Sequence, residues 1–169
     1  MRFNLRTMTM NKWFNKLAVV VLGSLMVLLT PLYALGSAGM GGSVGACVRC
    51  YVSHRPEYYG EVAAMAFMFG VGGLLVLGLQ LLCAKLMGRL GCAAAVGMLR
   101  GCSYVVPVLF VPGCMMTLGD IRPAEVPYVP LMMAVGVCFA LLPYFLCRKK
   151  DGAVIRWVER NNIVNNSSE

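Results

Sequence analysis

Two cysteines with two residues between them, Cys47 and Cys50, form the motif with the clearest chemical potential in this 169-residue chain. Such a pair can act in redox exchange because its geometry lowers a thiol pKa. It can also bind a metal ion with His54 and Glu57, which follow at helical spacing, although Pro56 opposes a continuous helix there. The third interpretation is a structural disulfide, either within the pair or with Cys114. We favour the structural disulfide and predict no metal site.

The redox interpretation has a parallel among known membrane enzymes. Cys47, Cys50 and the nearby Arg55 resemble the first exported loop of the disulfide-bond-generating quinone reductases of bacterial inner membranes. That resemblance implies a catalytic role for the three residues and quinone as cofactor. Those enzymes also need a second exported cysteine pair, and this sequence offers at most Cys114 in the corresponding loop.

Long apolar stretches must position these residues. The chain is 59% hydrophobic and only 13% charged, and residues 17–39, 62–84 and 126–147 each approach the roughly 20 apolar residues that cross a bilayer as a helix. A fourth span lies within residues 91–119, with Gly101 to Gly119 as the favoured limits. Because lipid cannot satisfy backbone polar groups, these spans are predicted to be helices. The expected fold is therefore all-α, a polytopic membrane protein with four transmembrane helices.

The net charge of +8 follows the spans, so it predicts topology and not nucleic-acid binding. With both chain ends in the cytoplasm, eleven basic residues face inward: Arg2, Arg6, Lys12, Lys16, Lys85, Arg89, Arg148, Lys149, Lys150, Arg156 and Arg160. Only three lie outside: Arg49, Arg55 and Arg122. Arg100 is placed at the cytoplasmic interface, because an arginine at mid-bilayer is costly. We predict a multi-pass protein of the bacterial inner membrane with a cytoplasmic C-terminus.

The first span supports two interpretations. A basic start, an apolar run and the small residues around Ala38 resemble a cleaved secretory signal, whereas the length of the run suits an uncleaved helix. Cleavage would leave three spans. The predicted organisation is a signal peptide or first helix at 1–38, an exported glycine-rich and C-x-x-C loop at 39–61, a helical bundle at 62–147 and a basic cytoplasmic tail at 148–169.

Small residues in the second span predict helix contacts. Ala66, Gly70, Gly73 and Gly78 would let neighbouring helices approach closely, either within the chain or between copies. The run from Gly36 to Gly45 is expected to be a flexible linker. Near the C-terminus, apolar residues 154–158 interrupted by Arg156 predict a short helix on the inner leaflet.

A family resemblance rests on residues 65–119. The glycine-rich run Phe69–Leu82, with Gly78, Leu79 and Leu82 at its end, is followed by a basic turn and a proline-containing span. This arrangement is similar to small polytopic inner-membrane proteins of conjugative and Dot/Icm-type (type IVB) secretion systems. The resemblance implies a non-enzymatic structural subunit that packs against other membrane subunits, or against copies of itself, without a cofactor. The alternatives are a thiol-disulfide oxidoreductase that uses Cys47 and Cys50, and a small immunity or exclusion membrane protein.

Overall fold

The computed structural model describes residues 3–53, 56–118, 123–148 and 152–159, and every element within them is helical. The five α-helices are α1 (Phe3–Val52), α2 (Tyr59–Arg89), α3 (Ala95–Leu118), α4 (Val129–Arg148) and α5 (Ala153–Glu159). Two short 3₁₀ helices, η1 (Pro56–Tyr58) and η2 (Pro123–Tyr128), precede α2 and α4. The predicted all-α fold is thus confirmed.

Four of these helices are long and apolar enough to cross a bilayer: Trp13–Val52, Tyr59–Arg89, Ala95–Met115 and Val126–Arg148. Their outward faces carry large exposed apolar side chains, such as Phe67, Leu75 and Val108. In a water-soluble protein so many exposed apolar side chains would promote aggregation, whereas lipid solvates them well. The described fold is that of a multi-pass membrane protein.

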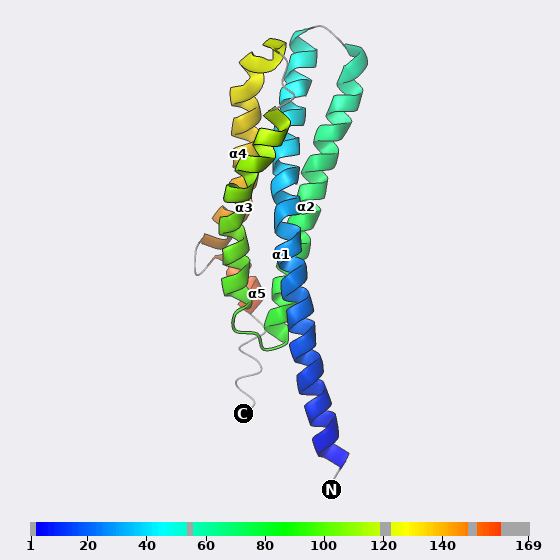
Figure 1. The fold of residues 1–169 in the computed structure, drawn as a ribbon, viewed down its shortest axis with the longest axis vertical. Helices are drawn as coiled ribbons and strands as arrows, with labels where there is room; N and C mark the ends of the chain where they lie inside the picture. Colours follow the sequence, from blue (N-terminus) through cyan, green and yellow to red (C-terminus); the bar gives the residue numbers. More distant parts are fainter. Residues whose placement is uncertain (1–2, 54–55, 119–122, 149–151, 160–169) are drawn as a thin grey trace.

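Helix α1 is the axis of the bundle, in contact with α2, α3 and α4 (Figure 1). Its 50 residues extend over about 75 Å, more than twice the roughly 30 Å of a bilayer core. The four long helices alternate in direction, and the N-terminal part of α1 projects beyond the others at the end where α5 lies. Both described ends of the chain therefore lie at the same end of the bundle.

The glycine-rich run 36–45 is helical, which differs from the predicted flexible linker. The helix continues through Cys47 and Cys50 to Val52, so this part of the predicted exported loop is also helical. Glycine lowers helix propensity in water, where its backbone has much freedom to lose. Between packed membrane helices the missing side chain is instead an advantage, because it allows close backbone contact.

Helix α2 ends in a hydrogen-bonded cap that turns the chain toward α3. Gly91 has φ of +78°, a conformation that glycine adopts without strain. The Gly91 N–H donates to the Gly88 carbonyl and the Cys92 N–H donates to the Met87 carbonyl, both at 3.0 Å. This pattern is a Schellman motif. The third span consequently begins at Ala95, earlier than the favoured limit at Gly101, and Arg100 lies in its second turn.

Two clusters of buried side chains make up the core. The first joins all four long helices near mid-bundle through Tyr33, Ala34, Leu77, Phe110 and Ala140, among others. The second lies toward the end where α5 is found, and it includes Met26, Cys83, Leu99, Ile155 and Val158. The predicted short helix at residues 154–158 is thus present as α5. Its Ile155 and Val158 are buried against the bundle and not turned toward lipid.

Candidate functional site

A glycine seam brings the backbones of α1 and α4 close together. A methyl group on Gly41 would overlap the Met132 carbonyl oxygen and would lie 3.2 Å from the Gly136 Cα. A methyl group on Gly45 would overlap the Met132 side chain. Gly136 in turn lies against Ser37 and Phe110, where an added Cβ would be 3.2 Å from the Ser37 carbonyl oxygen. Only glycine allows α1 and α4 to approach this closely.

This seam was not predicted from the sequence, although a signal for it was present. Ser37, Gly41 and Gly45 are spaced four apart, and so are Ala34, Ala38 and Gly42. Residues four apart share one face of a helix, so these two rows are small-residue stripes. By the rules for water-soluble chains such a glycine-rich run is a linker, whereas in a membrane its small residues favour close helix packing.

The predicted packing residues of α2 divide into two groups. Gly70 and Gly73 are buried: an added Cβ on Gly70 would contact Met40, and one on Gly73 would lie 2.6 Å from the Phe139 ring. Ala66 is half-buried. Gly78 is exposed, and a side chain there would point into open space. The first three residues therefore face the bundle, whereas Gly78 lies on its outer surface.

Tyr33 links α1 to α4 through a hydrogen bond that compensates for a proline. Its hydroxyl donates to the Phe139 carbonyl at 2.8 Å, and its ring stacks on Phe139 with centroids 5.6 Å apart. In an α-helix the Phe139 carbonyl would accept from the N–H of residue 143, which is Pro143 and has none. In a bilayer core water cannot replace that donor. Tyr33 therefore satisfies a carbonyl group that the α4 backbone leaves without a partner.

Gln80 links α2 to α1 in a similar way. Its side-chain amide donates to the Thr30 hydroxyl oxygen at 3.2 Å and to the Met26 carbonyl at 3.3 Å. Thr30 itself donates to the Met26 carbonyl at 3.0 Å. Gln80 and Thr30 are each 2% exposed, so the group is shielded from lipid. These polar side chains hold α1 and α2 together and therefore have a structural role.

Cys47 and Cys50 lie on the last turns of α1, half-buried and with free thiols. Residues three apart on a helix have Cβ atoms about 5–6 Å apart, wider than the roughly 3.8 Å of a disulfide. A bond between them would therefore distort the end of the helix, and the predicted disulfide stays a prediction.

Cys114 does not lie near the Cys47–Cys50 pair. Its neighbour Gly113 faces Ala38, where an added Cβ would be 3.5 Å from the Ala38 methyl group. Ala38 precedes Cys47 by nine residues, or about 14 Å of helix. His54 and Arg55 lie outside the described residues. Among the described residues, no three potential metal ligands come together.

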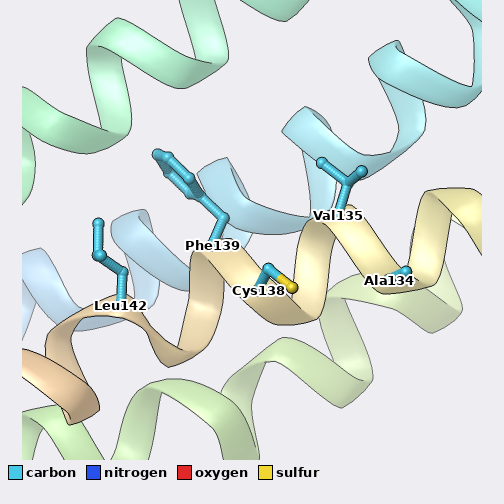
Figure 2. A pocket seen from close by; sticks show the side chains of 5 residues that line it. All are labelled: Ala134, Val135, Cys138, Phe139 and Leu142. Atoms are coloured by element: carbon cyan, nitrogen blue, oxygen red, sulfur yellow. The ribbon is translucent and has the colours of Figure 1, made fainter.

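An apolar hollow of about 380 Å³ lies along α4, lined by Ala134, Val135, Cys138, Phe139 and Leu142. Figure 2 shows these side chains on α4, with Phe139 pointing toward α2. A second apolar hollow of about 310 Å³ lies between α3 and α4, around Pro107, Phe110 and Val137. Linings of this kind suit an acyl chain or an apolar helix surface better than a polar substrate.

The fold and these contacts define a multi-pass helical membrane protein whose helices are joined by glycine seams and interhelical hydrogen bonds. No protein-family model, no curated protein and no solved structure matches the chain. The resemblance to secretion-system proteins therefore stays a prediction.

Proposed function

We propose that this chain is a non-enzymatic structural subunit of a bacterial inner-membrane assembly, one that packs against other membrane subunits. The observation that supports this role is that polar side chains at the centre of the bundle bond to neighbouring helices. Tyr33 and Gln80 both form interhelical hydrogen bonds, and small residues hold α1 against α2 and α4. Such an interior makes a stable unit that can dock as a whole. On the sequence resemblance, the assembly is a conjugative transfer or type IV secretion apparatus.

Gly78 is the predicted packing residue that is available to a partner. It is exposed on α2, beside large apolar side chains such as Leu75, Leu79 and Leu82. A glycine on a lipid-facing surface allows a neighbouring helix to approach closely. Gly73 makes the corresponding contact inside the chain.

The test is affinity purification of tagged chain from native membranes, followed by identification of the proteins that accompany it. We expect Gly78→Leu to lose its membrane partners while its thermal unfolding in detergent is unchanged, because the added side chain meets nothing within the chain. Gly73→Leu is the matched comparison and should lower thermal stability instead. Recovery of the same partners with Gly78→Leu as with the unmodified chain would refute docking through this face. Partners unrelated to transfer or secretion would refute the choice of assembly.

A further inference from the structure

Two arginines and two tyrosines lie on α3 and α4 near the end of the bundle where α5 is found. Arg100 and Tyr104 are one turn apart on α3, and Tyr144 and Arg148 are one turn apart on α4. The Tyr104 and Tyr144 rings pack edge to face with centroids 5.5 Å apart. The Arg148 guanidinium carbon lies 5.9 Å from the centre of the Tyr144 ring. We refer to these four residues as the arginine–tyrosine cluster.

Arg100 is incompletely satisfied within the described chain. Its Nε atom is buried and has no hydrogen-bond partner among the described residues. The guanidinium lies close enough to the Cys147 thiol for the two groups to interact electrostatically. Cys147 precedes Arg148, so both arginines are at the same end of the α3–α4 contact. A buried N–H donor without an acceptor is costly, so Arg100 retains unmet hydrogen-bonding capacity at this end of the α3–α4 contact.

Two cations of α2 lie outside the cluster. Lys85 lies over the Trp157 ring, 3.7 Å from its centre, and Arg89 is exposed at the end of α2. The described residues show no ion pair for Arg100 or Arg148. A ligand for this region must therefore be an anion with several acceptor oxygens, and arginine recognises phosphate oxygens well.

We propose that the arginine–tyrosine cluster binds the phosphate headgroup of an anionic phospholipid. The cluster lies toward one end of two candidate membrane spans, Ala95–Met115 and Val126–Arg148. Basic pockets between transmembrane helices commonly bind such headgroups, and tyrosine hydroxyls are suited to the interface. The apolar hollow between α3 and α4 begins farther along the same helix pair, at Pro107 and Leu141, where it could accommodate an acyl chain.

The experiment uses the full chain in nanodiscs that contain three parts phosphatidylcholine to one part phosphatidylglycerol. After mild detergent extraction, native mass spectrometry measures which lipids remain bound. We expect preferential retention of phosphatidylglycerol, reduced about fivefold by Arg100→Gln and by Arg148→Gln. Arg148 is exposed, so its replacement leaves the core intact.

Arg89→Gln is the matched control. Arg89 is exposed at the same end and its replacement removes the same charge, so we expect lipid retention to be unchanged. Equal losses with Arg89→Gln and Arg100→Gln would show a diffuse charge effect and would overturn the proposal. Absence of any preference for phosphatidylglycerol would overturn it too. Displacement of the lipid by inorganic phosphate, with the total ionic strength held at about 0.15 M, would assign the site to a soluble anion and would also overturn it.

Discussion

At the residue scale, Tyr33 shows how a single side chain makes a proline acceptable inside a membrane helix. Pro143 is almost fully buried in α4, and its missing N–H leaves the Phe139 carbonyl without its usual helical donor. The Tyr33 hydroxyl, from α1, supplies the hydrogen bond. A backbone irregularity in one helix is thereby converted into a specific contact with another.

This arrangement predicts energetic coupling between Tyr33 and Pro143. Tyr33→Phe should destabilise the bundle by about 1–3 kcal/mol, because it leaves a buried carbonyl unsatisfied. In a Pro143→Ala background the restored N–H at position 143 can bond Phe139, so the same replacement should cost less. Thermal unfolding of the two single variants and the double variant in detergent measures the coupling. Equal costs of Tyr33→Phe in both backgrounds would contradict this role for the hydroxyl.

The sequence did not reveal this contact, because the hydrogen bond joins residues 106 positions apart. A proline within an apolar run indicates that a carbonyl lacks its donor, but it does not identify which distant side chain replaces it. Local signals were more informative. Gly70 and Gly73, predicted to pack against other helices, are buried against Met40 and Phe139. Gly78 is also a glycine of α2, but it lies on the outer surface, because the packing of α1 and α4 decides which face of α2 is buried.

At the element scale, α1 is held in place by its glycines. Gly41→Ala should destabilise the bundle by on the order of 1–3 kcal/mol, since the new methyl group would overlap the backbone of α4. Gly72→Ala is the control, because an added Cβ there meets nothing within 4 Å. That change should be neutral, or stabilising by up to about 1 kcal/mol through helix propensity. Unfolding in detergent compares the two variants, and equal effects would contradict a close α1–α4 contact.

Hydropathy located the four helices well but not all of their limits. The predicted spans 62–84 and 126–147 fall within α2 and within α4 and the residues just before it. The first helix extends far beyond 17–39 at both ends, because glycine and cysteine at 36–50 continue it as a packing surface. A membrane helix inside a bundle must fit against its neighbours. Sequence rules derived from water-soluble proteins therefore underestimate the length of such a helix.

At the scale of the whole molecule, the distribution of charge and the fold both place the two chain ends at one end of the bundle. Lys85 and Arg89 are near the end of α2, Arg100 is near the start of α3, Arg148 ends α4 and Arg156 is in α5, and these segments come together at one end of the bundle (Figure 1). Arg49, in the last turn of α1, lies toward the opposite end. Four spans of alternating direction bring the start of α1 to that same end. For a four-span chain, the number of spans and the distribution of charge predicted both chain ends on one side.

The described core also bears on the two interpretations of the first span. Met26, Tyr33 and Ala34 are buried at 0–1% exposure, and they contribute to both core clusters. Removal of residues 1–38 would take these side chains from the bundle and would expose Gln80 and the Phe139 carbonyl to lipid. Both core clusters, as described, therefore require α1 as one continuous helix.

Hydrogen–deuterium exchange of the chain in lipid nanodiscs tests that requirement most directly, at the amides of residues 36–45. A continuous α1 packed against α4 predicts that these amides stay protected for hours, like those of α2. A flexible exported linker would exchange within seconds, and a cleaved signal would remove residues 1–38 from the protein, so that no peptide from them would be recovered. Either of these results would contradict the structure proposed for the bundle.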